Sequence, residues 1–234
     1  MLTIGHRGAA GVAPENSLEA LRAGVDAGAD MLEFDIHLTA DRIPVLIHDN
    51  NLMRTHKKRM FVHSSTLAEL REATADSHSP IVTLEEVFEE FYGKVLLNIE
   101  IKQRGVAKDL VAFLKSKYVK KAADWENFVF SSFYATELLA LRHLASKATL
   151  WLLHNRNPFI FIAYARLIQL DGVGFHRLYI NELALEIAKK TNLFTYAYTV
   201  NRPHTALILS RKGLDAIVTD YPAKILKEIK KERA

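Results

Sequence analysis

The stretch MLEFDIHLTADRIPVLIHD (residues 31–49) decides the fold, because it contains two strand-like apolar runs in close succession. Only the five residues LTADR separate MLEFDIH from IPVLIHD. A crossover between parallel strands needs about a dozen residues or more, whereas an antiparallel hairpin needs only a short turn. The second run is therefore expected to fold back on the first as a hairpin strand.

Outside this hairpin, apolar runs rich in β-branched residues alternate with helix-length periodic segments along almost the whole chain. This alternation is typical of parallel strands joined by crossover helices. Strands are expected at 2–6, 30–37, 43–48, 94–101, 127–131, 148–153, 172–176, 194–200 and 215–219. Helices are expected at 16–28, 83–92, 105–121, 134–145, 158–169, 181–191, 203–212 and 222–232. Without the hairpin strand, eight strands remain, so the predicted fold class is α/β, a (β/α)8 TIM barrel.

Residues from about 38 to 81 then form a small insertion after the second barrel strand, which includes the hairpin strand 43–48. Connections of this length usually carry function. The competing architecture is an open doubly wound sheet, but the glycines after the first strand do not have the G-x-G-x-x-G spacing of a dinucleotide site. Three capping boxes are also predicted, starting at Asn16, Thr66 and Thr83.

Length and composition limit the classes of protein that this chain can be. With 234 residues and 49% hydrophobic residues, residues 1–234 are expected to form a single globular domain. The chain has no cysteine, which excludes disulfides, thiolate metal sites and a thiol nucleophile. The net charge of +4 comes largely from the tail KILKEIKKERA, which we interpret as a solubility feature, so no nucleic-acid partner is expected.

The sequence also bears on location and assembly. The first apolar run reaches His6 too soon for a signal peptide, so a cytoplasmic protein is expected. The most apolar stretch, residues 159–170, is too short to cross a bilayer and contains Arg166, so no transmembrane segment is expected. We interpret it as a buried or partner-facing helix, which leaves a homo-oligomer open.

Polar side chains share one face at the ends of two neighbouring strands. Residues two apart on a strand point the same way, so Glu33 and Asp35 lie on one face, as do Glu100 and Lys102. Three carboxylates that meet in a desolvated barrel mouth repel one another unless a cation offsets their charge. An oxygen-only ligand set favours one hard divalent cation, Mg²⁺ or Ca²⁺. The sequence therefore predicts a metal site formed by Glu33, Asp35 and Glu100.

Two histidines are expected beside this site. The hairpin places residues 46–48 opposite Asp35, so His48 lies close to the metal, and His6 reaches the same mouth from the first strand. Imidazoles suit general acid and general base roles near neutral pH. Arg7 and Lys102 add fixed positive charge that matches phosphate oxygens. Together these residues predict proton transfer at a phosphoryl group.

These residues resemble the glycerophosphodiester phosphodiesterase family, which shares a barrel with phosphatidylinositol-specific phospholipases C. The matching stretches run in family order over nearly the whole chain and are HRG (6–8), PENS (14–17), EFDIHLTAD (33–41), PVLIHD (44–49), TLEEV (83–87), NIEIK (98–102), SSF (131–133), YTVN (198–201) and DAIVTDYP (215–222). The resemblance implies hydrolysis of a small-molecule glycerophosphodiester to sn-glycerol 3-phosphate and an alcohol.

The resemblance also implies roles for individual residues. His6 and His48 correspond to the catalytic acid–base pair, and Glu15 lies beside them. Tyr198 stands where the family commonly has Trp, which bears on how the alcohol end of the substrate packs. Two alternatives stay open: a lysophospholipase D with an apolar groove for an acyl chain, and a non-catalytic phosphodiester-binding protein. His176, at the end of strand 172–176, is a further candidate for substrate contact.

Overall fold

The predicted hairpin is present in the computed structural model, which describes residues 1–77 and 79–233. Strand β2 (Met31–Leu38) pairs antiparallel with β3 (Pro44–Leu46), and Ile36 lies opposite Leu46. The peptide N–H of Ile47 donates to the carbonyl of Asp35 over 3.1 Å, so the end of the hairpin strand lies beside the carboxyl end of β2.

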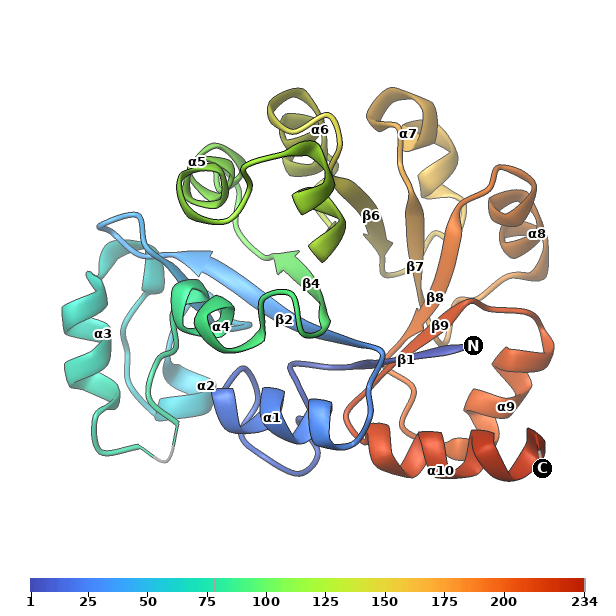
Figure 1. Cartoon of the computed structure of the whole chain (residues 1–234), viewed down its shortest axis with the longest axis horizontal. Helices are drawn as coiled ribbons and strands as arrows, with labels where there is room; N and C mark the ends of the chain where they lie inside the picture. Colours follow the sequence, from blue (N-terminus) through green and yellow to red (C-terminus); the bar gives the residue numbers. More distant parts are fainter. Residues whose placement is uncertain (78, 234) are drawn as a thin grey trace.

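The remaining strands form a closed parallel barrel (Figure 1). They are β1 (Leu2–Gly5), β2, β4 (Leu96–Ile101), β5 (Phe128–Ser132), β6 (Thr149–His154), β7 (Gly172–His176), β8 (Phe194–Tyr198) and β9 (Ala216–Thr219). The strand order is β1-β9-β8-β7-β6-β5-β4-β2, and pairing of β1 with β2 closes the ring. The predicted (β/α)8 barrel is confirmed, and each expected strand lies within two residues of an observed one at both ends.

Helices surround the barrel and bury its outer surface (Figure 1). They are α1 (Leu18–Asp26), α4 (Leu84–Phe91), α5 (Ala107–Lys117), α6 (Ala135–Leu144), α7 (Ile160–Ile168), α8 (Glu182–Lys190), α9 (Pro203–Arg211) and α10 (Pro222–Arg233), and the 3₁₀ helix η2 (Ala122–Asn127) precedes β5. Alternation along β2 sends Leu32, Phe34 and Ile36 into the layer between strands and helices. Glu33 and Asp35 consequently point into the barrel.

The interior of the barrel has its own apolar packing below the mouth. Ile4, Met31, Trp151 and Tyr196 belong to this inner cluster. The flat rings of Trp151 and Phe194 stack with centroids 4.7 Å apart. The polar residues of β2 and β4 therefore rest on a rigid apolar floor at the carboxyl ends of the strands, where barrel enzymes carry their sites.

The segment between β3 and α4 packs as a small unit beyond the end of β2 (Figure 1). It contains α2 (Met53–His56), the 3₁₀ helix η1 (Val62–Ser64) and α3 (Leu67–Thr74), which the strand-and-helix pattern did not predict. Leu52, Val62, Leu70 and Ile81 form its separate apolar cluster. We call residues 38–81 the excursion.

Two of the three predicted capping boxes are present and one prediction is wrong. Thr66 and Thr83 each accept from the N3 backbone amide, and the N3 glutamates return the bond. The N-cap of α1 is Ser17, whose hydroxyl accepts from Ala20, rather than Asn16. The backbone of Asn16 is left-handed, with φ of 57°, so this residue lies outside the helix and its amide is available to the barrel mouth.

The apolar segment 159–170 forms α7. Its Phe161 and Ile168 are buried, while Ile162 and Leu167 are exposed. Among the described residues, no helix combines the length and the apolar character that a bilayer crossing requires. The helix packs one side against the barrel, so the expectation of a buried helix is confirmed for that side.

Candidate active site

Glu33, Asp35 and Glu100 meet at the mouth of the barrel. Register pairs Asp35 of β2 directly with Glu100 of β4, and Glu33 points the same way one pleat below. All three residues are buried, and one carboxylate oxygen of each lies within 4.8 Å of the others. Within the described part of the chain, Oε1 of Glu33 is buried without a hydrogen-bond partner. Three converging carboxylates, with a buried oxygen that has no hydrogen-bond partner among the described residues, fit the ligand set of a hard divalent cation.

The three carboxyl groups do not ionise alike. Burial raises the pKa of Glu33 to about 8, and the nearby Asp35 carboxylate adds to the shift. Burial likewise raises the pKa of Glu100, although Lys102 opposes it. Burial would also raise the pKa of Asp35, but Lys102 and Arg7 together hold it well below its usual value. The site without a metal ion thus contains one carboxyl group whose pKa is lowered, that of Asp35, and two whose pKa values are raised.

Two cations hold Asp35 from opposite sides. Nε of Arg7 lies 3.0 Å from Oδ2 of Asp35, and Nζ of Lys102 lies 3.2 Å from Oδ1. Lys102 also forms an ion pair with Glu100. The peptide N–H of Arg7 donates to Glu33 over 2.9 Å, so Arg7 contacts two of the three acidic residues. Both side chains are largely buried and can reach an anion bound over the carboxylates.

The turn after β1 that presents Arg7 depends on Gly8. Arg7 and Gly8 both have positive φ, of 48° and 87°. A Cβ on Gly8 would lie 2.3 Å from the backbone carbon of Ala20, which is in α1. Only glycine allows the chain to turn this close to the helix, and the turn aims the Arg7 side chain at the mouth.

His6 is held by groups from the other end of the chain. Its Nδ1 lies 2.6 Å from Oδ1 of Asp220, which directly follows β9. Asn201 donates to the other oxygen of Asp220, and the peptide N–H of Asp220 donates to Asn201 over 2.9 Å. Burial would lower the pKa of His6, but the bond to Asp220 and the charge of Glu33 raise it above its usual value.

His48 has a similar arrangement on the excursion side. Its Nδ1 lies 2.7 Å from Oδ1 of Asp49, and its carbonyl accepts from Nε2 of His37 over 3.2 Å. Within the described residues, Nε2 of His6 and Nε2 of His48 make no hydrogen bond. Each imidazole therefore has Nδ1 fixed by a carboxylate and presents Nε2 for proton transfer.

Glu15 and Asn16 join the loop after β1 to this site. Glu15 accepts from Nη1 of Arg7 over 2.9 Å. The side-chain amide of Asn16 donates to Oδ2 of Asp35 over 2.9 Å, and its oxygen accepts from the Asp35 peptide N–H. The charged side chains of Arg7 and Lys102 and the side-chain amide of Asn16 thus all contact the Asp35 carboxylate.

Comparison with known proteins decides the family. The model of the glycerophosphoryl diester phosphodiesterase family matches residues 6–224. The chain belongs to this family. It is 32% identical to YhdW of Bacillus subtilis, a candidate glycerophosphodiester phosphodiesterase by name, over 99% of both chains. It is 29% identical to a glycerophosphodiester phosphodiesterase of Caldanaerobacter subterraneus over 98% of both chains.

A solved structure extends this likeness to three dimensions. An Oleispira antarctica phosphodiesterase, determined in complex with the product sn-glycerol-3-phosphate, is 27% identical and superposes with a TM-score of 0.86. The match covers 98% of this chain and 97% of that one. The expected family, barrel and enzyme class, a phosphoric diester hydrolase, are thereby confirmed.

In this family member, aromatic rings line the mouth beside the charged groups. The Tyr198 ring packs edge-on against Phe133 and His176, with centroids 6.0 Å and 5.8 Å apart. Its hydroxyl donates to the carbonyl of His154. Nζ of Lys102 lies 5.4 Å from the centre of the Phe133 ring. The Tyr198 hydroxyl is therefore already engaged in a bond to the backbone.

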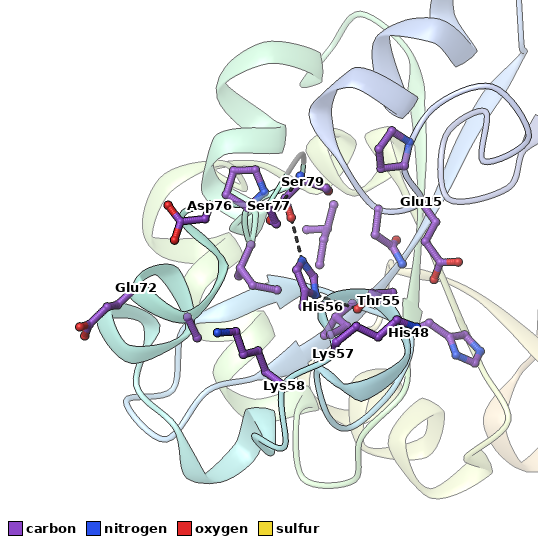
Figure 2. A pocket seen from close by; sticks show the side chains of 17 residues that line it. Glu15, His48, Thr55, His56, Lys57, Lys58, Glu72, Asp76, Ser77 and Ser79 are labelled. Atoms are coloured by element: carbon purple, nitrogen blue, oxygen red, sulfur yellow. Dashed lines mark hydrogen bonds between the residues drawn. The ribbon is translucent and has the colours of Figure 1, made fainter.

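A cavity of about 550 Å³ lies on the excursion side of His48. Figure 2 shows the side chains of Glu15 and His48 at its border, pointing away from the cavity, while His56 crosses it and bonds to the carbonyl of Ser79 over 2.8 Å. The cavity thus adjoins the candidate site at Glu15 and His48.

The sequence did not single out the partners of the two histidines. Asp49 follows His48 directly. Asp220 lies in the stretch DAIVTDYP (215–222), directly after the last strand, so this place could have located it beside His6 in a closed barrel. Asn201 ends the matching stretch YTVN (198–201), whereas Arg54 lies in none of the matching stretches and had no such signal.

Proposed function

We propose that this chain hydrolyses glycerophosphodiesters to sn-glycerol 3-phosphate and an alcohol with the help of one divalent cation, Mg²⁺ or Ca²⁺. Glu33, Asp35 and Glu100 would hold the cation. The observation that carries the proposal is the arrangement of two carboxylate-bonded imidazoles at the mouth that contains these buried carboxylates. The product named for the Oleispira antarctica relative supports the same substrate class.

The residues divide the chemistry among them. The cation, when bound, supplies Lewis-acid stabilisation of charge on the phosphoryl group. Arg7 and Lys102 bind the phosphate oxygens and offset the negative charge that develops in the transition state. One of His6 and His48 removes a proton from the attacking hydroxyl, which belongs to water or to the glycerol moiety. The other protonates the leaving alkoxide through Nε2.

The remaining residues position the substrate. The Tyr198 ring packs against the organic part of the substrate at the mouth, and Glu15 holds the Arg7 guanidinium over Asp35. We infer that residues 1–234 work as one catalytic domain in which the excursion contributes His48. The partner in this account is a small-molecule diester.

The test measures sn-glycerol 3-phosphate release from a panel of glycerophosphodiesters, with and without a chelator. We expect turnover that the chelator abolishes and Mg²⁺ or Ca²⁺ restores. His6→Ala and His48→Ala should each lower kcat by roughly 10²-fold or more with the fold intact. His143→Ala is the matched control, because His143 is exposed in the last turn of α6, away from the barrel mouth.

Three outcomes would contradict the proposal. Near wild-type turnover in either histidine variant would remove that residue from the acid–base pair. Binding of diesters without turnover would indicate a non-catalytic phosphodiester-binding protein. Faster cleavage of a monoacyl analogue than of glycerophosphocholine would favour a lysophospholipase D.

A further inference from the structure

Arg54 of α2 links two parts of the site that the barrel itself does not connect. Its Nε donates to Oδ2 of Asp49 over 2.6 Å, and Asp49 is the residue bonded to the His48 imidazole. Its two terminal nitrogens donate to both oxygens of Glu15, the residue bonded to Arg7. One guanidinium thus spans the acid–base residue of the excursion and the phosphate-binding residue that follows β1.

The backbone that carries Arg54 is fixed. Leu52, just before α2, is fully buried in the cluster of the excursion, and its peptide N–H donates to the carbonyl of Met60 over 3.0 Å. At the other end of α2, His56 bonds to the carbonyl of Ser79 (Figure 2). The short helix is therefore held at both ends, and Arg54 extends from a rigid base toward the site.

Partly exposed ion pairs usually contribute little to stability, and about half of the Arg54 side chain is exposed. The effect of Arg54 on the orientation of Asp49 and Glu15 does not depend on this small contribution to stability. Among the described residues, the Asp49 carboxylate would without Arg54 be bonded only to His48, and both groups would be free to rotate together. The planar guanidinium restrains Asp49 through one nitrogen and Glu15 through two, a geometry that a lysine ammonium cannot reproduce.

We propose that Arg54 is a positioning residue, which orients His48 through Asp49 and Arg7 through Glu15 and so fastens the excursion onto the barrel mouth. The inference rests on the proposed role of His48. It extends that role, because it makes the excursion a part of the active site that must be correctly placed before proton transfer is efficient.

The test compares Arg54→Ala, Arg54→Lys and the control Arg71→Ala. Arg71 lies on α3 of the same excursion, forms a 2.8 Å ion pair with Glu86, and has a side-chain exposure of 45% against 47% for Arg54. We expect Arg54→Ala to lower kcat by about tenfold or more, with smaller changes in KM. Divalent-cation affinity and the melting temperature should stay close to wild type, and Arg54→Lys should recover little activity.

Two further measurements separate positioning from a merely structural role. Added guanidinium ion at millimolar concentration should restore part of the activity of Arg54→Ala and leave Arg71→Ala unchanged. In a double-mutant cycle, Arg54→Ala should cost less in a background that already carries Asp49→Ala than in the wild type, since the route to His48 is then already broken and only the restraint on Glu15 remains to be lost.

The results distinguish this inference from the proposed function. If His48→Ala is inactive while Arg54→Ala keeps wild-type kcat, the inference is overturned and the acid–base assignment stands. A loss of activity that is fully additive with Asp49→Ala and insensitive to guanidinium would also overturn it. If His48→Ala is fully active, the proposed acid–base pair itself is wrong.

Discussion

Divalent-cation binding should release a proton from this protein, because Glu33 must ionise before it can act as a ligand. Burial and the Asp35 charge raise the pKa of Glu33 to about 8 in the absence of metal. At pH 7 such a group is protonated in about nine-tenths of the molecules. Binding of Mg²⁺ or Ca²⁺ at pH 7 should therefore release about 0.9 proton from Glu33.

The same linkage makes the apparent affinity depend on pH. Between pH 8 and pH 6 the ionised fraction of a group with a pKa of about 8 falls roughly 50-fold, so the apparent association constant should fall by about the same factor. The sign is fixed by the chemistry: protons compete with the cation, so affinity weakens as pH falls. Asp35 contributes nothing to this window, because its pKa is held below its usual value.

Isothermal titration in two buffers of different ionisation enthalpy measures both quantities. Glu33→Gln should bind the cation more weakly and lose most of the proton release. Glu137→Gln is the control, since Glu137 is buried and, within the part of the chain that the structure describes, its side chain bonds only to backbone amides at the start of α5. Equal dissociation constants at pH 6 and pH 8, with no proton release, would refute the reasoning.

Two further predictions concern the fold around the site. Gly8→Ala should destabilise the protein by about 3 kcal/mol or more in chemical denaturation, because the new Cβ would meet the backbone of Ala20. Gly93→Ala is the control and should cost only about 1 kcal/mol, because Gly93 has a similar φ but its new Cβ would have no atom within 4 Å. Equal losses of stability in the two variants would contradict the close-approach argument. Burial lowers the pKa of His154 to about 4, so the free energy of unfolding should fall by up to about 3 kcal/mol as the pH drops from about 6.5 toward 4. His154→Phe should reduce this pH dependence. An unchanged pH profile of stability in that variant would count against the assignment to His154.

The sequence could predict the framework because the relevant signals are local. Alternation along residues 31–38 determines which side chains face the barrel, and the five-residue spacer requires a hairpin. These two facts already place Glu33, Asp35 and His48 at one mouth, and the register of β2 with β4 and β3 agrees. A shift of one residue would move every side chain of a strand to the opposite face, so the alternation of polar and apolar residues specifies which side chains face the barrel.

The hydrogen-bond partners could not be predicted in the same way. His6 and Asp220 are 214 residues apart, and only closure of the ring between β1 and β9 brings them together. Asn16 has the residue type and spacing of an N-cap, yet its left-handed backbone directs the amide to Asp35 instead. The helices of the excursion are short, so their apolar positions do not establish a period.

The proposed active site therefore depends on three structural conditions that differ in range. The carboxylates lie on β2 and β4, which pair directly, so the cation site requires only adjacent strands. His6 requires closure of the barrel through Asp220, and His48 requires docking of the excursion through Asp49 and Arg54. Because these contacts are separate, substitutions that loosen either histidine should leave cation binding intact, while loss of a carboxylate should weaken cation binding without displacing the histidines. Histidine variants should accordingly lose turnover while they keep metal affinity, whereas carboxylate variants should lose both.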